Sequence, residues 1–309
     1  MIRVLFAARK SAWAEYQTVL PQAIAEAGVA AEVVQEAAPE SVDYIVYAPN
    51  STVQDFTPYT RTKAVLSLWA GVEGVVGNTT LAQPLARMVD PGLTEGMVEW
   101  CVAHSLRHHL ATDRDVMRAD QTWAPHVPPL ARDRKVTVLG LGELGRAVAT
   151  ALQALNFDVT GWSRTQKTVP HVRCVSGDDG LRTALSGAEI VVLLLPLTGS
   201  TENILDAEAF ALLAPGAFVI NPGRGPLIDD AALLAALDTG QVAHATLDVF
   251  REEPLPRDHA FWAHPRVTVT PHIASATRPQ SSARVIAENI RRGEAGEPFV
   301  HLVDRSAGY

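Results

Sequence analysis

The sequence predicts an α/β protein built from two doubly wound parallel-sheet domains. The chain of 309 residues is longer than a domain with a single hydrophobic core usually is, so two domains are expected. Short apolar runs alternate with helix-like segments in two series, one before residue 92 and one after residue 135. This alternation is typical of parallel sheets covered by helices. A glycine-rich turn follows the first apolar run of the second series.

The first series ends in a long helix and an irregular segment. Strands are expected at residues 2–7, 31–34, 44–47 and 64–68, with a helix over residues 12–27 that Gly28 ends. After Pro91-Gly92, residues 94–110 read as one helix with Thr94 as N-cap. Residues 121–129 are rich in Trp and Pro and cannot form a regular element. They form either an interdomain loop or an arm that packs on a partner subunit, and the exposed Trp favours the arm.

The second series predicts a dinucleotide-binding sheet. Six strands are expected, at residues 135–140, 158–162, 190–195, 217–221, 245–249 and 267–270. A last helix over residues 280–292 follows after this sheet is complete, so we expect it to return to the first domain. The predicted domains are therefore residues 1–92 completed by 280–309, which bind substrate, and residues 93–279, which bind the dinucleotide.

The glycine-rich turn carries the G-x-G-x-x-G pattern of a Rossmann-like site. In Gly140-Leu141-Gly142-Glu143-Leu144-Gly145, the first glycine makes a tight turn, and the second lets the backbone approach a pyrophosphate. The third allows close packing of helix on strand. The helix that begins here offers free N–H groups and a positive dipole end to the phosphates.

The turn after the second strand bears on cofactor selectivity. An NAD-selective site usually has an acidic residue at this place, whereas here Ser163, Arg164 and Thr165 follow the strand. Arg164 can bind a 2′-phosphate in a bidentate fork, the two hydroxyls can donate to it, and Lys167 adds a second positive charge. A solvated polar turn is the alternative interpretation. We favour NADPH over NADH.

Three polar clusters follow later strands, at the edge where open α/β sheets bind ligands. Arg224 lies in Asn221-Pro222-Gly223-Arg224-Gly225, Asp248 and Glu253 follow the next strand, and His272 follows the last. Reduction of a 2-oxo acid needs these three types of group. A cation holds the carboxylate, an imidazolium donates a proton, and a carboxylate orients the imidazole. Taken singly, Arg224 is as well explained by a glycine-rich surface turn, and His272 by a structural histidine.

The ordered motifs resemble the D-2-hydroxyacid dehydrogenase family over nearly the whole chain. They are Gly-x-Gly-x-x-Gly, Asn-x-x-Arg-Gly, Asp-Val-Phe-x-x-Glu-Pro and Pro-His. Residues 162–165, 271–279 and 303–309 look more narrowly like the glyoxylate/hydroxypyruvate reductase A branch. The resemblance implies a Rossmann-like cofactor domain and a smaller, discontinuous flavodoxin-like substrate domain. It also implies NADPH-dependent reduction of small 2-oxo acids such as glyoxylate and hydroxypyruvate.

Residue roles also follow from the resemblance. Arg224 binds the substrate carboxylate, Glu253 partners His272, His272 donates the proton, and Asp248 lies near the nicotinamide, with a polar strand cap as the alternative for Asp248. Further implied cofactor contacts are Leu195, Pro196, Asn221, Pro222, Gly223 and Ser275. Implied substrate contacts are Trp69, Ala70, Gly71, Val72 and Arg278. Glu73 replaces the more usual Asp after Gly-Val. The alternative interpretations are that Trp69 belongs to the hydrophobic core and that Arg278 faces solvent.

The composition limits the possible binding partners and the cellular location of the protein. The hydrophobic fraction of 47% and charged fraction of 19% are those of an ordinary soluble globular protein. A net charge of −8 argues against nucleic-acid binding, and no apolar run is long enough to span a membrane. Two cysteines without metal spacing and no secretory leader suggest a cytoplasmic protein, and no metal is expected. A homodimer is expected. Alternative functions are a D-lactate or phosphoglycerate type of dehydrogenase, or a nonenzymatic nucleotide-sensing scaffold.

Overall fold

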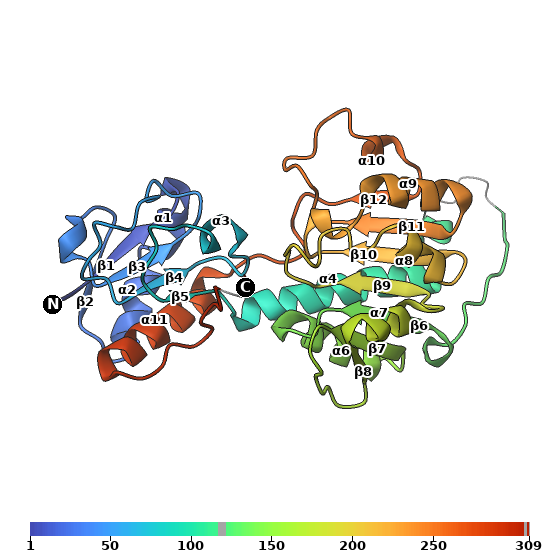
Figure 1. Ribbon diagram of the computed structural model, residues 1–309. Helices are drawn as coiled ribbons and strands as arrows, with labels where there is room; N and C mark the ends of the chain where they lie inside the picture. Colours follow the sequence, from blue (N-terminus) through green and yellow to red (C-terminus); the bar gives the residue numbers. More distant parts are fainter. Residues whose placement is uncertain (117–121, 306–307, 309) are drawn as a thin grey trace. The chain divides into compact units, whose positions relative to one another are not determined.

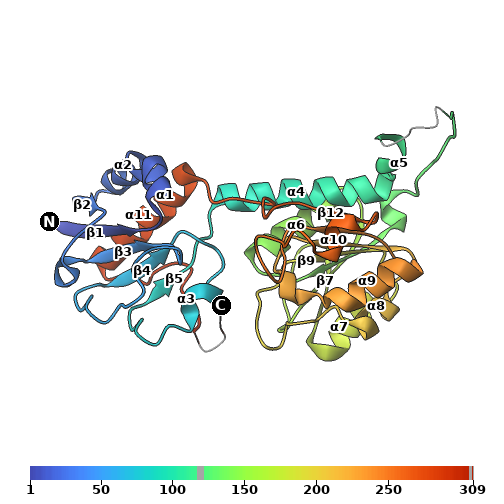
Figure 2. The ribbon, with the colours of Figure 1, turned by 90° about the horizontal axis from the view of Figure 1, so that it is seen from above.

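The computed structural model describes residues 1–116, 122–305 and 308, and Figures 1 and 2 show its ribbon in two views. Gln121 of the predicted arm and Ser306, Ala307 and Tyr309 of the C-terminal motif lie outside the described residues. The chain forms two compact units, residues 1–93 with 276–309, and residues 94–275. It enters the first unit again before residue 280, because the Thr277 hydroxyl donates to the Leu68 carbonyl at 2.9 Å.

The first unit contains a five-stranded parallel sheet. Its strands run in the order β2 (Ala31–Val34), β1 (Ile2–Ala7), β3 (Tyr44–Tyr47), β4 (Ala64–Ser67) and β5 (Leu85–Ala86). This 2-1-3-4-5 order is the flavodoxin-like one, as the resemblance implied. The sequence did not predict β5, because two residues are too few to produce a periodic pattern.

Helices and loops cover the two faces of this sheet. Side chains of α1 (Lys10–Tyr16), α2 (Val19–Glu26) and α11 (Pro279–Ala295) form one core with one face, and α3 (Glu73–Val76) packs on the other (Figure 2). The prediction of a single helix over residues 12–27 was wrong. Pro21 has no N–H to bond back to Gln17, so it is accommodated in the first turn of a new helix.

The second unit contains a seven-stranded parallel sheet. The order is β12 (Val267–Val269), β11 (Val242–Leu247), β10 (Ala217–Asn221), β9 (Ile190–Leu193), β6 (Lys135–Leu139), β7 (Asp158–Ser163) and β8 (Arg173–Ser176). The two halves meet at β9 and β6, as in a Rossmann-like sheet. The six predicted strands are present with shifted ends. The seventh, β8, was missed because it is a short edge strand with polar residues at both ends.

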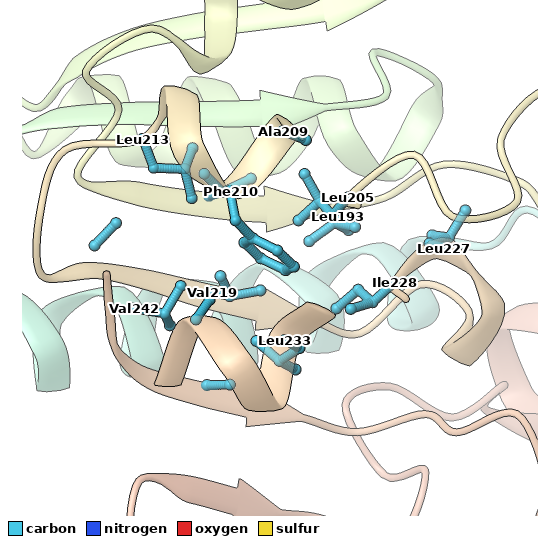
Figure 3. Packing of buried hydrophobic residues seen from close by; sticks show 14 of the residues in the cluster. Leu193, Leu205, Ala209, Phe210, Leu213, Val219, Leu227, Ile228, Leu233 and Val242 are labelled. Atoms are coloured by element: carbon cyan, nitrogen blue, oxygen red, sulfur yellow. The ribbon is translucent and has the colours of Figure 1, made fainter. Parts of the chain in front are cut away.

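Two layers of helices cover this sheet. On one face, α7 (Gly177–Leu185), α8 (Ala207–Leu212) and α9 (Asp230–Thr239) contribute to a core that contains Phe210, Val219 and Leu233 (Figure 3). The other face packs on α6 (Glu143–Ala154) and α4 (Pro91–Leu110). The start predicted for α4 was wrong: Asp90, not Thr94, caps it by accepting from the Leu93 N–H at 3.1 Å.

The remaining short helices are α5 (Asp113–Val116) and α10 (Ala260–Ala263), with 3₁₀ turns at Pro39–Ser41, Ala131–Asp133 and Gly225–Leu227. No helix within the described ranges is long and apolar enough to cross a membrane. All strands of the larger sheet are parallel, so their carboxyl ends share one edge. The candidate residues of the second unit follow these strand ends.

Candidate active site

The glycine turn between β6 and α6 has the geometry that its sequence predicted. Gly140 has φ +102°, a conformation that side chains disfavour, and a Cβ there would lie 2.5 Å from the Leu194 carbonyl oxygen, beside Leu195. A Cβ on Gly145 would lie 1.7 Å from the Gly140 carbonyl oxygen. Only glycine therefore lets α6 begin this close to β6.

The N-terminus of α6 is open to a ligand. Gly142 is the N-cap, no side chain caps the helix there, and a Cβ added to Gly142 would meet no atom within 4 Å outside its chain neighbours. The first N–H groups of the helix therefore face open space, which suits an anion. Glu143 in the first turn is neutralised by Arg146, whose guanidinium lies 2.5 Å from its carboxylate.

The turn after β7 exposes its positive charges. Arg164, Thr165 and Lys167 are exposed, whereas Ser163 is buried and its hydroxyl donates to the Thr165 carbonyl at 2.8 Å. Ser163 thus shapes the turn, and Arg164, Thr165 and Lys167 are among its exposed side chains. The expected donation from Ser163 to a 2′-phosphate stays a prediction. Pro196 follows β9, directly after Leu194 and Leu195, which lie beside Gly140.

Asn221 holds the turn that carries Arg224. Its buried amide accepts from the Gly223 N–H at 3.0 Å and donates to the Arg224 carbonyl at 2.9 Å. The Arg224 guanidinium in turn donates to the Gly223 carbonyl at 2.6 Å. A Cβ on Gly225 would lie 2.0 Å from the Phe250 carbonyl carbon. The Arg224 turn therefore packs, backbone on backbone, against the loop that carries Glu253.

His272 and Glu253 form a hydrogen-bonded pair. The His272 Nδ1 lies 2.7 Å from Glu253 Oε2, and Glu253 Oε1 accepts from the Phe250 N–H at 2.9 Å. Their side chains are 50% and 35% exposed, so the pair is accessible to a ligand. Because Nδ1 faces the carboxylate, Nε2 is the nitrogen left to exchange a proton.

Hydrogen bonds to Asp248 hold the loop that carries His272. The Asp248 carboxylate is 0% exposed and accepts from the Thr270 hydroxyl at 2.5 Å and from the N–H groups of Ile273 and Ala274, each at 2.8 Å. The His272 N–H donates to the Asp248 carbonyl at 2.9 Å, and His272 itself has φ +54°. These contacts are those of the polar strand cap, the alternative considered for Asp248. They also hold His272 in a backbone conformation that costs energy.

Five of the candidate substrate residues lie in the first unit, whereas Arg224 and His272 lie in the second. Trp69 follows β4, its backbone is held by the Ser67 hydroxyl at 3.0 Å, and its side chain is 44% exposed. Ala70 and Gly71 lead to Val72, which is buried and precedes α3. Arg278 is the exposed N-cap residue of α11, and its neighbour Thr277 donates to the residue before Trp69. These five candidates therefore belong to adjoining segments.

Sequence reasoning missed two supporting residues. The Thr270 hydroxyl donates to the Asp248 carboxylate, and the only sign of this role in the sequence is that Thr270 directly precedes Pro271-His272. Phe250 gave none, because it acts through its backbone. Ser275, a predicted cofactor contact, packs against α4, where a Cβ on Gly96 would lie 2.8 Å from its hydroxyl.

Comparison with known proteins identifies the family. Residues 100–274, more than half of the chain, match the family described as D-isomer specific 2-hydroxyacid dehydrogenase, NAD binding domain. The chain belongs to this family. It is accordingly an NAD(P)-dependent oxidoreductase of the 2-hydroxyacid dehydrogenase class, and both parallel sheets agree with solved members.

Relatives narrow the branch within the dehydrogenase family. Glyoxylate/hydroxypyruvate reductase A of Serratia proteamaculans is 40% identical over 257 residues, which cover 81% of this chain and 82% of the relative. A D-isomer specific 2-hydroxyacid dehydrogenase from Xanthobacter autotrophicus, solved with NADPH and MES, is 38% identical with a TM-score of 0.90 over 100% of this chain and 99% of its own. The NADPH-dependent glyoxylate/hydroxypyruvate reductase of Sinorhizobium meliloti, solved with NADP and sulfate, is 33% identical with a TM-score of 0.89 over 100% of both chains.

Proposed function

We propose that this dehydrogenase reduces glyoxylate and hydroxypyruvate to their 2-hydroxy acids with NADPH. The observation that carries the proposal is the His272–Glu253 pair at 2.7 Å, beside the Arg224 turn at the ligand-binding edge of the sheet. An oriented imidazole, a partner carboxylate and a carboxylate-binding cation are what reduction of a 2-oxo acid requires. The choice of glyoxylate and hydroxypyruvate as substrates and of NADPH as cofactor is supported by the names of the relatives given above.

Each of these residues performs one task in the proposed reaction. Arg224 binds the carboxylate of the 2-oxo acid in a bidentate fork. Glu253 holds His272 at Nδ1 and orients the ring, so that Nε2 of the imidazolium donates a proton to the carbonyl oxygen. When bound, NADPH supplies the hydride that the carbonyl carbon accepts. The product is a 2-hydroxy acid and His272 is left neutral.

The residues around the glycine turn fit a dinucleotide. The open space over Gly142 and the uncapped start of α6 suit a pyrophosphate, and the adjacent turn offers Arg164, Thr165 and Lys167 to a 2′-phosphate. Leu195, Pro196, Asn221, Pro222, Gly223 and Ser275 are the proposed further contacts. Asp248 is proposed to act by holding the His272 loop.

The first unit is proposed to bind the acid. Backbone N–H groups from Ala70 to Val72 are proposed donors to its carboxylate, with Trp69 and Arg278 beside them. Because the chain carries a net charge of −8, such local donors, rather than the overall field, must attract an anionic substrate.

A homodimer and a cytoplasmic location are also part of the proposal. Trp123 and Val127 in the segment after α5 are 94% and 88% exposed, which suits contact with a second copy. Both cysteines, Cys101 and Cys174, are free thiols, and such thiols persist in a reducing compartment.

A kinetic comparison tests the proposed function. Oxidation of NADPH and of NADH is followed spectrophotometrically with glyoxylate, hydroxypyruvate, pyruvate and phosphohydroxypyruvate. We expect fast turnover of NADPH with the first two acids and a lower kcat/KM with NADH. Faster turnover with pyruvate or phosphohydroxypyruvate would replace the proposal with a D-lactate or phosphoglycerate type of enzyme. Dinucleotide binding without any turnover would favour a sensing scaffold.

A further inference from the structure

A side-chain brace holds the turn that carries Arg164. Gln166, inside this turn, donates from its amide to the Lys167 carbonyl at 3.0 Å and to the Cys174 carbonyl of β8 at 3.3 Å. The Ser176 hydroxyl, at the end of β8, donates to the amide oxygen of Gln166 at 3.1 Å. Ser163 and Ser176 are neighbours in the β7–β8 register, so the brace spans the ends of both strands.

The chemistry of its partners fixes the orientation of this amide. Both carbonyls can only accept, so they must face the amide nitrogen, and the hydroxyl is left to donate to the amide oxygen. Glutamate cannot make the same set of bonds, because it has no donor for the carbonyls. Ser163 adds a fourth bond within the same turn by donating to the Thr165 carbonyl at 2.8 Å.

The Ser176 hydroxyl bonds to Gln166 and does not cap helix α7. Ser176 is the N-cap residue of α7, with the extended backbone of a cap (φ −148°, ψ 164°), yet its side chain makes no capping bond. In the same unit, Asp206 and Asp229 do cap α8 and α9, accepting N–H groups at 2.9 and 3.0 Å. A serine at an N-cap normally stabilises its helix. The Ser176 hydroxyl is instead directed at the turn.

We propose that Gln166 and Ser176 are positioning residues that set the selectivity for NADPH over NADH. They hold the backbone of residues 163–167 so that Arg164, Thr165 and Lys167 are presented together before a 2′-phosphate arrives. A preordered turn loses less conformational freedom on binding. The inference rests on the proposed function, since it assigns a purpose to the same cofactor turn. A cofactor without a 2′-phosphate gains nothing from the brace.

Binding measurements on the free protein test the brace. Dissociation constants for NADPH and NADH are measured by calorimetry for the wild type, Gln166→Met, Ser176→Ala and the double variant. Gln166→Met keeps the side-chain volume but loses every hydrogen bond. We expect NADPH affinity to fall by roughly 5- to 30-fold, as for one or two lost hydrogen bonds, with NADH affinity changed by less than about twofold. The double variant should lose no more than Gln166→Met alone, because one brace is removed in each case.

Stability and amide exchange separate positioning from a general structural role. Gln166→Met releases the Ser176 hydroxyl to cap α7, so Tm should stay the same or rise while amides 164–168 exchange faster in the absence of cofactor. Gln22→Ala is the matched control, since this exposed glutamine also hydrogen-bonds, to Glu26 at 2.8 Å, but in the first unit.

The two possible failures are distinguishable. An unchanged ratio of NADPH to NADH affinity in Gln166→Met, or equal weakening of both, would overturn the brace while leaving the proposed function intact. A wild type that shows no preference for NADPH would overturn the proposed cofactor selectivity itself, and the brace with it.

Discussion

At the scale of residues, the site combines an exposed reacting pair with a buried support. His272 is presented from a left-handed backbone conformation (φ +54°), which Asp248 stabilises by hydrogen bonds to both sides of it. Such a conformation is kept only where surrounding contacts determine it. Asp248 therefore holds the backbone of His272 in place, while the Glu253 carboxylate contacts Nδ1 and leaves Nε2 as the nitrogen that is proposed to donate the proton.

His272→Ala should lower kcat by about 10²–10⁴ because the positioned proton donor is lost. NADPH affinity, measured by fluorescence or calorimetry, should stay within about threefold of the wild type. His126→Ala, on an exposed segment, is the control and should leave both quantities unchanged. If His272→Ala turns over at a rate close to the wild type, another group donates the proton.

At the scale of elements, α4 buries histidines against the sheet. His108 stacks on Phe218 at 4.7 Å between ring centroids and hydrogen-bonds Thr246 at 2.9 Å. The ring centroid of His244 lies 5.3 Å from that of His108, and His244 hydrogen-bonds Thr268 at 2.8 Å. Burial, aided by nearby cationic groups, lowers the pKa of His108 to about 3 and that of His244 to about 4. Both rings are therefore neutral in the folded protein near pH 7.

This burial predicts a loss of stability in acid. Below the unfolded pKa of about 6.5, the unfolded chain binds protons that the folded chain excludes, so the free energy of unfolding falls as the pH drops from about 6.5 toward 4. Each such histidine contributes a slope of up to about 1.4 kcal/mol per pH unit. Denaturant unfolding at a series of pH values measures this slope.

Removing one of the buried histidines isolates its share of the slope. His108→Gln should reduce the slope between pH 6 and 4 by up to that amount, whereas His126→Gln on its exposed segment should not change it. A slope in His108→Gln equal to that of the wild type would mean that acid acts through other groups.

At the scale of the whole molecule, several apolar side chains that follow α4 in the described part of the chain are exposed. Val116, Trp123, Val127 and Leu130 are all exposed, the first three of them by more than three quarters of their surface. Trp anchors interfaces more often than most residues. This segment is therefore the proposed contact with a second copy.

The double variant Trp123→Ser with Val127→Ser should weaken the dimer by at least about 30-fold in Kd, corresponding to roughly 2 kcal/mol for a central anchor. Sedimentation velocity over a concentration series measures the shift. Leu155→Ser, at the exposed C-cap residue that follows α6, is the control and should assemble as the wild type does. A wild type that is monomeric at all concentrations would contradict the proposed dimer.

Long periodic elements and motifs with a local cause could be predicted from the sequence. The strand–glycine–helix unit around Gly140 depends largely on neighbours a few residues away, and a strand such as β9 is a continuous apolar run. The short edge strands β5 and β8 could not be predicted, because pairing with a neighbouring strand determines them. The break between α1 and α2 did have a local signal in Pro21, which the prediction of one helix did not take into account.

The sequence by itself determined the fold class, the family and which residue types take part in the chemistry, because these depend on local order along the chain. Only the tertiary structure decided what each side chain contacts. It joined His272 to Glu253 across 19 positions, turned Asp248 into the support of the His272 loop, and directed Ser176 at Gln166 instead of its own helix. These contacts connect the ends of different strands, and their distances are set by sheet register and backbone packing, which no local pattern encodes.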